Sequence, residues 1–437
     1  MKLPRGLLLM ALLLTGFVSG CCRSRQETCQ AWWWGNEVTE RSQVGLGDVG
    51  QQALPAVVPQ LAEPELSQLA PALLPDAAPE NAYNYRGLEA IQCQCLAASQ
   101  SAIAQLLEDE QQAVNGLFRE ASHQGNPASC SEQSLRQQIL LHAAEHARNQ
   151  SASAAMQLYF GLMKAEAKRQ LTADGLKEIA ASLEKVERLR MAGVAADANP
   201  LEQQRLELQE KQLEAELAID RLNGQLQPLL GVTAWDRHER LWPTASLSIA
   251  ATEIDIEAAV AEGLQGHPEL NTLRLLHTQL NAKTLPAIRQ ALGAIEGLLG
   301  GSPSPLPISM KLIWQHIVGC VPQQVGDLSA RRSQIDRYLA HRESAISTEI
   351  RLAAQEVESR LQQIQLARNS VETWQDRQQR ATAPAGAQIN LADQHAAQMG
   401  LLSARNSLYE YAVDWHLAHS KLRAAQGLLA RDCQVKP

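Results

Sequence analysis

Apolar residues recur at alternating steps of three and four residues along two long segments, residues 154–190 and 200–230. Such spacing places one narrow apolar stripe on each of two helices, as in the seam of a coiled coil. The segments therefore predict a long antiparallel hairpin with arms about 45–55 Å long. The stripe positions are Leu176, Ile179, Leu183, Val186 and Leu189 in the first arm and Leu206, Leu213, Leu217 and Leu226 in the second.

The break between the arms, residues 191–199, contains Gly193 and ends in Asn199, which Pro200 follows. Glycine favours the end of a helix, whereas asparagine caps a helix and proline is tolerated in its first turn. The break therefore predicts where one helix ends and the next begins.

A similar order recurs later in the chain. Residues 350–429 again comprise a long helical segment, a break with Gly386, and a second helical segment ending in Leu-Leu. Gly193 and Gly386 are 193 residues apart, close to half the chain, which indicates an internal duplication rather than a short-repeat solenoid.

These patterns predict a mainly α fold of long antiparallel helical hairpins with few or no β-strands. Residues 308–321 are the only segment with strand character. The expected organisation is a signal peptide at 1–20, a Pro-rich tether at 21–86, a first helical repeat at 87–250, and a second at 251–437 with an irregular insert at about 283–330.

The N-terminus has the pattern of a secretory signal. Lys2 and Arg5 precede an apolar run at residues 6–18 that is too short to cross a membrane in the mature protein. The run leads into Val-Ser-Gly-Cys at residues 18–21, which resembles the bacterial lipobox, where the cysteine is lipidated and becomes the new N-terminus. This resemblance predicts a lipid on Cys21; the alternative is an ordinary signal peptide with a coincidental cysteine.

The tether that follows is rich in proline, which favours extended backbone. Trp32, Trp33 and Trp34 lie close to the expected lipid, and they would either sit at a membrane interface or form a local packing cluster. No later stretch reaches about 18 consecutive apolar residues, so no transmembrane helix is expected.

Composition narrows the possible functions. Aromatic residues make up only 4% of the 437 residues, which suits layered helices better than a large compact core. The net charge is −8 with no basic stripe, so the chain gives little support for nucleic-acid binding.

Eight cysteines occur, and an exported chain can join them in disulfides. Without Cys21 seven remain, so at least one is free, lipidated or paired between chains. Cys93 and Cys95 lack the spacing and the partner pair of a zinc site.

The chain resembles the outer-membrane efflux family typified by TolC. The resemblance rests on LYFGLMKAEAKRQL at 158–171, the break at Gly193, AAVAEGLQGHPEL at 258–270 and SLYEYAVDWHLAHSKLRAAQG at 407–427. It covers about residues 87–430 and lies in the order and spacing of these segments rather than in one diagnostic motif.

The resemblance implies a homotrimer whose hairpins form a periplasmic tunnel, lipid-anchored on the periplasmic side of the outer membrane. It implies work with a periplasmic adaptor and an inner-membrane pump in export, with no cofactor and no catalytic residue. It also implies two β-hairpins per protomer, near residues 113–137 and 283–330, that contribute to a shared membrane barrel.

The chain departs from the family where these β-hairpins are expected. A membrane strand needs about 9–11 residues of alternating character. Residues 113–137 contain none, and the second region offers at most residues 308–321. Cys130 and Cys320 fall in these two equivalent places, and we hypothesise that they form a disulfide between two truncated tips; chance placement is the alternative.

The sharpest catalytic pattern is H-x-x-E-H at His142, Glu145 and His146. In the inverted zincins two such histidines bind zinc and the glutamate is the base. No third ligand is evident, so the preferred interpretation is a solvated helix face and no metal site. His267, His416 and His419 are interpreted as surface or packing residues.

Charged residues between the apolar stripes would either contact an adaptor or another helix, or simply form a solvated face. They are Glu184, Lys185, Glu187, Arg188, Glu207, Glu210 and Lys211.

The sequence thus predicts an efflux conduit component without enzymatic activity. The alternative, from a different class, is a periplasmic structural or adaptor lipoprotein that kept the helical hairpins and lost the barrel. A metalloenzyme built on the H-x-x-E-H motif is the third hypothesis.

Overall fold

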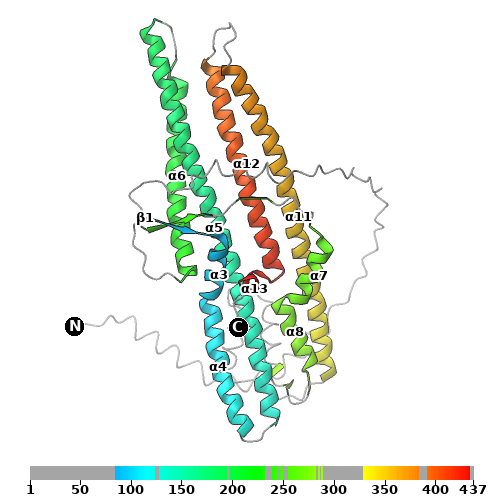
Figure 1. Ribbon diagram of the computed structural model, residues 1–437. Helices are drawn as coiled ribbons and strands as arrows, with labels where there is room; N and C mark the ends of the chain where they lie inside the picture. Colours follow the sequence, from blue (N-terminus) through cyan, green and yellow to red (C-terminus); the bar gives the residue numbers. More distant parts are fainter. Residues whose placement is uncertain are drawn as a thin grey trace, which may run out of the picture. The chain divides into compact units, whose positions relative to one another are not determined.

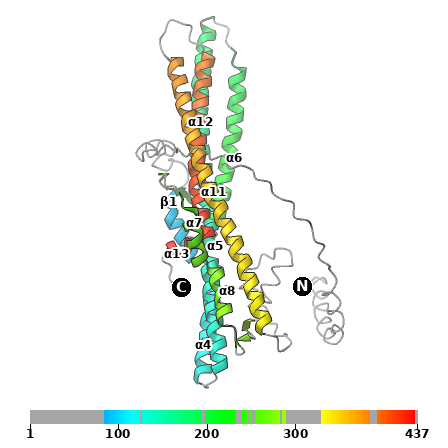
Figure 2. The same ribbon diagram turned by 90° about the vertical axis from the view of Figure 1, so that its right-hand side faces the viewer.

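The structure is a computed structural model, drawn in Figures 1 and 2. It describes residues 84–123, 127–193, 197–231, 239–244, 247–249, 254–281, 284–285, 287–288, 328–382 and 391–433. For residues 117–123, 127–130, 382 and 391–392 it describes the backbone only.

The first predicted hairpin is present and longer than expected. Helix α5 (Pro127–Met191) has 65 residues, about 98 Å, because the helical pattern that begins upstream continues without interruption. The helix ends just before Gly193, whose φ of +78° is the left-handed conformation typical of a helix end. Helix α6 (Asn199–Leu229) then returns with proline in its first turn.

The second hairpin consists of α11 (Leu328–Thr382) and α12 (Leu391–Ala425). The four long helices form one layer in the order α6, α5, α12, α11, because α5 contacts α6, α12 contacts α5, and α11 contacts α12 (Figure 1). Helices α5 and α12 therefore have long neighbours on both sides, whereas α6 and α11 are the two edges of the layer.

Shorter elements pack around the lower part of this layer. Strands β1 (Asn84–Leu88) and β2 (Glu239–Pro243) pair in parallel, with Leu88 opposite Pro243. The prediction of few or no strands allowed for such a pair but did not locate it. The remaining helices are α3 (Ala90–Ser99), α4 (Ala102–His123), α7 (Ile256–Gly266), α8 (Pro268–Thr278) and α13 (Leu429–Asp432).

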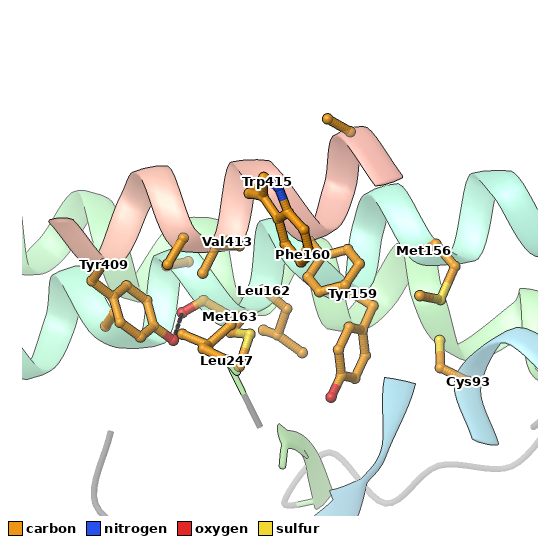
Figure 3. Close-up of a cluster of buried hydrophobic side chains, with 14 of the residues drawn as sticks. Cys93, Met156, Tyr159, Phe160, Leu162, Met163, Leu247, Tyr409, Val413 and Trp415 are labelled. Atoms are coloured by element: carbon orange, nitrogen blue, oxygen red, sulfur yellow. Dashed lines mark hydrogen bonds between the residues drawn. The ribbon is translucent and has the colours of Figure 1, made fainter. Parts of the chain in front are cut away.

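The largest buried cluster lies where the two hairpins meet, and Figure 3 shows its centre. Tyr159 and Tyr409 are fully buried. The Tyr159 hydroxyl donates to the carbonyl of Leu88 at 2.9 Å, and the Tyr409 hydroxyl donates to that of Met163 at 3.5 Å. Because both hydroxyls have acceptors, these large side chains fill the core without leaving a polar group unpaired.

Several predictions about local structure can be compared with the observed elements. Every described residue of 113–137 is helical, in α4 or α5, so the described part of this region contains no strand, in agreement with the prediction from the sequence. Residues 308–321 lie outside the described residues, as do Cys21, Cys320 and Gly386.

Strand β1 begins at Asn84, within the segment predicted as tether. None of the described helices is apolar over a stretch long enough to cross a membrane.

Candidate functional surfaces

The outward side of α6 carries leucines that were predicted to face inward. Leu206, Leu213 and Leu217 expose 61%, 63% and 71% of their surface. The prediction that they form the hairpin seam is therefore wrong, although Leu226 is fully buried as expected. The physical reason is that a second set of positions, also at steps of three and four, is turned away from solvent instead. That set is Leu208, Gln212, Ala215, Ile219, Asn223 and Leu226. Leu208 lies against Gly175 of α5, whereas Asn223 accepts from the Leu241 N–H of β2.

The α5 side of the hairpin follows the prediction more closely. Ile179 and Val186 are buried, and Leu176 and Leu183 are half-buried, whereas the prediction is wrong for Leu189, which is exposed. Close approach of the two arms relies on small residues: a Cβ added at Gly175 would lie 2.8 Å from Leu208 Cδ1. The seam therefore mixes apolar, glutamine and small side chains, which explains why leucine spacing alone does not identify it.

The other edge of the layer, helix α11, also carries exposed leucines. On α11, Leu352 and Leu366 expose 61% and 69% of their surface. We call the outward side of α6 with Leu206, Leu213 and Leu217 the α6 edge, and the outward side of α11 with these two leucines the α11 edge. Further exposed apolar side chains lie on α3 and α4 and at the end of α5, among them Ile91, Leu106 and Met191.

The two edge helices differ in charge. Helix α6 carries six carboxylates and three cationic side chains, a net charge of −3. Helix α11 carries nine arginines and seven carboxylates, a net charge of +2. The two edge helices therefore carry net charges of opposite sign.

Ion pairs fix the relative heights of the four helices. Lys168 of α5 pairs with Glu214 of α6 at 3.3 Å. Lys164, one turn earlier, pairs with Asp414 of α12, which also lies 3.9 Å from Arg360 of α11. Counting along the helices at 1.5 Å per residue, Leu213 lies about 7–8 Å and Leu366 about 9 Å above the level of Asp414. The most central leucine of the α6 edge is thus level with a leucine of the α11 edge.

Near the hairpin tips one histidine connects both hairpins. His395 Nε2 of α12 lies 2.9 Å from Gln204 Oε1 of α6, and His395 Nδ1 lies 3.4 Å from Ser182 Oγ of α5. Burial lowers the pKa of His395, which favours the neutral ring. The charged residues of the seam region, by contrast, are exposed: Glu184, Lys185, Glu187, Arg188, Glu207, Glu210 and Lys211.

The H-x-x-E-H segment on α5 packs against other helices. Glu145 accepts from Arg431 Nε of α13 at 2.6 Å, and His142 Nδ1 lies 3.7 Å from Glu145. The ring of His146 lies 6.0 Å from that of His267, between centroids. The segment is therefore half-buried, and the expectation of a fully solvated helix face is wrong. Among the described residues no cluster of three or more His, Cys, Asp or Glu side chains could hold a metal ion.

His267 has a defined structural role. Only 5% of it is exposed, and its Nδ1 accepts from the backbone N–H of Glu269 at 3.3 Å, which caps α8. Burial lowers its pKa to about 4, helped by the nearby ring of His146. Burial also lowers the pKa of His146. His416 stacks on Phe160 with 6.0 Å between ring centroids, so the interpretation of this histidine as a packing residue agrees with the structure.

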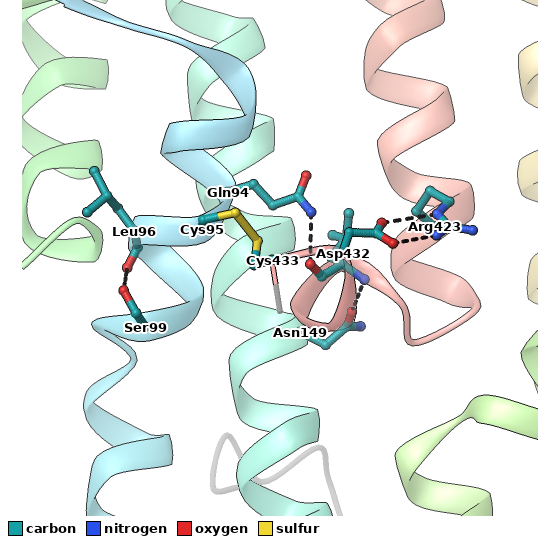
Figure 4. Close-up of a disulfide and its surroundings, with 9 residues drawn as sticks. Gln94, Cys95, Leu96, Ser99, Asn149, Arg423, Asp432 and Cys433 are labelled. Atoms are coloured by element: carbon teal, nitrogen blue, oxygen red, sulfur yellow. Dashed lines mark hydrogen bonds and ion pairs between the residues drawn. A yellow bond between two sulfur atoms is a disulfide. The ribbon is translucent and has the colours of Figure 1, made fainter. Parts of the chain in front are cut away.

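A disulfide joins the two ends of the described chain. Cys95 of α3 bonds to Cys433, just after α13, with 5.2 Å between the Cα atoms (Figure 4). The hypothesis of a Cys130–Cys320 bond stays a prediction, since Cys320 and the Cys130 side chain lie outside the described part. Sequence reasoning missed the observed pair because Cys433 has no local signal and the bond spans 338 residues.

The sequence matches no protein-family model and no curated protein. Solved structures do match. The channel protein CusC superposes with a TM-score of 0.55 at 13% identity over 80% of this chain and 96% of CusC. The outer-membrane channel OprN gives 0.53 at 13% identity over 77% of this chain and 90% of OprN. MtrE of Neisseria gonorrhoeae, an outer-membrane channel in its open state, superposes with a TM-score of 0.53 at 10% identity over 77% of this chain and 88% of MtrE.

At such identities the likeness concerns the fold. The chain has the TolC-like fold of outer-membrane channels, and the mainly α hairpin architecture predicted from the sequence is confirmed.

Proposed function

We propose that the protein is a conduit component of an export system, in which copies of the chain close their helical layers into a tube. The observation that supports this most strongly is the pair of open edges. A layer of four long helices with exposed leucines at both ends is incomplete as a single chain, because a monomer gains by removing such side chains from water.

The edges also differ from each other, which favours a ring. Contact between the α6 edge of one copy and the α11 edge of the next is head-to-tail, and such contacts generate closed rings when the rotation closes. The opposite net charges of α6 and α11 favour this pairing over contact between two like edges. The level of Leu213 matches that of Leu366, so neither copy has to shift along the tube axis.

The remaining parts of the proposal come from the resemblance to TolC-type proteins and from the likeness of fold. The ring is a homotrimer, held at the periplasmic side of the outer membrane by a lipid on Cys21. A periplasmic adaptor and an inner-membrane pump would complete the export system. The hairpin ends, where Met191 exposes 75% of its surface, are the available surface for an adaptor. The chain would contribute no catalytic residue.

One observation favours the alternative function. The described residues of 113–137 form the helical hairpin α4–α5, where the resemblance led us to expect strands. In the alternative, the protein is a non-transporting periplasmic lipoprotein that uses the same hairpins for structural or adaptor contacts.

Planar-bilayer recordings on the full-length protein, extracted from membranes in detergent, test the conduit directly. We expect stepwise ion conductance from the fraction whose mass corresponds to three copies. A fraction of three copies that never conducts would contradict transport and support the alternative. The Cys21→Ser variant is the control for anchoring: a chain without a pore should lose membrane attachment with the lipid, whereas a conduit should stay in the membrane, and in both cases the helical content should be kept.

A further inference from the structure

The end of the chain is held at one place by several contacts that are independent of the proposed function. The short helix α13 packs against α3, α5 and α12. Asn149 of α5 contacts the chain on both sides of the turn into α13: its Nδ2 donates to the carbonyl of Ala424 at 2.9 Å, and its Oδ1 accepts from the N–H of Leu429 at 2.9 Å. Gln94 of α3 donates to the carbonyl of Leu429 at 2.8 Å.

Ion pairs and a tight turn complete this contact. Arg423 and Asp432 pair at 2.6 Å across the turn, and Arg431 reaches Glu145 of α5. Gly427 has a φ of +76°, and a Cβ added there would lie 2.7 Å from Pro268 Cδ. The turn before α13 therefore both needs glycine and lies tightly against the start of α8.

The two cysteines of α3, Cys93 and Cys95, differ in their exposure to solvent. The Cys95–Cys433 bond is only half-buried on both sides, so a small or protein thiol can reach it. Cys93, two residues earlier, is fully buried against α5, with its Sγ 3.9 Å from the carbonyl of Ala155 (Figure 3). Burial raises the pKa of the Cys93 thiol to about 12, so this thiol is inert while α3 stays in place.

We propose that α13 is a redox-sensitive latch: the Cys95–Cys433 disulfide fastens the C-terminal helix to α3, and its reduction releases the contact between the start of the first repeat and the end of the second. Without the bond, α13 is held by hydrogen bonds, ion pairs and the burial of Leu429 and Ala430 against one alanine each of α3 and α5, and a four-residue helix with so few contacts opens readily. Two observations support this inference. The bond joins the first described helix to the end of the last one, and it is accessible to solvent although the thiol beside it is buried and unreactive.

The chemistry requires a dithiol reductant. One of its thiolates attacks a sulfur of the Cys95–Cys433 bond and forms a mixed disulfide, and the second thiolate resolves it. The reductant becomes a disulfide, having supplied two electrons, and Cys95 and Cys433 each leave as a thiol after taking up one proton.

The test measures both partners of the latch in the full-length protein, before and after treatment with dithiothreitol. Hydrogen exchange reports on residues 424–433, and alkylation of Cys93 by N-ethylmaleimide, read by peptide mass spectrometry, reports on α3. We expect exchange of 428–433 and alkylation of Cys93 each to rise at least tenfold on reduction, with circular dichroism unchanged. The Cys433→Ser variant should behave as the reduced protein does, and Cys130→Ser should not.

Two results would overturn the latch. One is the recovery of Cys95 and Cys433 as free thiols from the unreduced protein. The other is exchange and alkylation that stay at the oxidised level after complete reduction. If Cys433→Ser loses helical content, the Asn149→Ala variant replaces it as the test. In this variant Cys93 should remain protected from alkylation while the disulfide is intact, and it should become reactive only after reductant is added.

Discussion

The layer edges and the region around α13 are built in opposite ways. At the edges, Leu213 and Leu366 expose most of their surface, although leucine gains more than most residues from burial. Around α13, even His267 and Asn149 are almost completely buried. We call this second region the junction, defined by Glu145, Asn149, His267, Gly427 and the Cys95–Cys433 bond. A surface that leaves leucine in water requires a partner, whereas one that buries His267 and Asn149 with hydrogen bonds to backbone groups of the same chain is built within one chain.

This difference predicts that the two regions respond to substitution in different ways. Changes at the edges should alter assembly and leave the stability of the single chain nearly unchanged. Changes at the junction should alter stability and leave the edge-to-edge contact intact.

The largest effect is expected from the double substitution Leu213→Glu and Leu217→Glu. Burying a leucine contributes about 1.5–3 kcal/mol, and a carboxylate placed in the same contact adds a desolvation cost. We expect the dissociation constant of the oligomer to rise at least about 100-fold, since 1.4 kcal/mol is a factor of ten. Mass photometry over a concentration series measures it. Gln225→Glu adds the same kind of charge to an exposed site on another side of α6 and should assemble normally.

Acid should weaken the junction next. The pKa of His267 is about 4 in the folded chain, below its ordinary value of about 6.5, so the folded state binds fewer protons than the unfolded state between these values. Stability is therefore fully present above pH 6.5 and falls as the pH drops toward 4, by about 3 kcal/mol for this residue. His146 acts in the same direction.

The groups that face these two histidines come from α5, α8, α11 and α13. They are His142, Glu145, Glu269, Tyr338, Arg342 and Arg431. Denaturant titrations between pH 4 and 7.5 measure the loss. The variant His146→Gln with His267→Asn should flatten the profile, since asparagine can still cap α8. An unchanged profile in that variant would assign the acid sensitivity to other groups.

A smaller loss is expected from Asn149→Ala. This change removes two hydrogen bonds to backbone groups around α13 and leaves those groups without that partner. We expect a loss of about 2 kcal/mol in the free energy of unfolding, measured by guanidinium titration of the oxidised protein. Gln157→Ala, at an exposed position further along α5, is the matched control and should change stability by less than about 0.5 kcal/mol.

The smallest effect concerns the contact between the hairpins. His395→Ala removes the links to Ser182 and Gln204, both between neutral groups, and should cost about 1 kcal/mol. Hydrogen exchange near the tips of α5 and α12 should rise more than exchange at the junction. Equal rises at both places would mean that the two regions are not energetically separate.

Much of the fold could be read from the sequence because it depends on local signals. Gly193 and the Asn199-Pro200 step mark the first hairpin break, and α5 and α6 end and begin there. The orientation of α6 could not be read in the same way. Leu206, Leu213 and Leu217 form a stripe of correct spacing, but periodicity does not say which of two opposite stripes meets the partner helix. The stripe that is turned away from solvent contains Gln212 and Asn223, and no hydrophobic pattern reveals such a stripe.

The junction was missed for a different reason. Its members come from residues as far apart as Cys95 and Cys433, and the pairing of cysteines depends on the folded chain rather than on spacing. The H-x-x-E-H pattern has the spacing of an inverted zincin, but in the structure its residues contact His267 and Arg431. The two strands were also missed, because five residues each are too few for a clear alternation.

The central claim is that the α6 edge of one copy meets the α11 edge of the next at the level of Leu213 and Leu366. It can be tested by combining Leu213→Cys with Leu366→Cys in one chain and adding a short bismaleimide to the assembled protein. We expect a ladder of covalent dimers and trimers in the double variant, and only monomer in either single variant and in the unsubstituted protein. Cross-linking of the Leu213→Cys variant with itself, or no cross-link in the double variant, would contradict it.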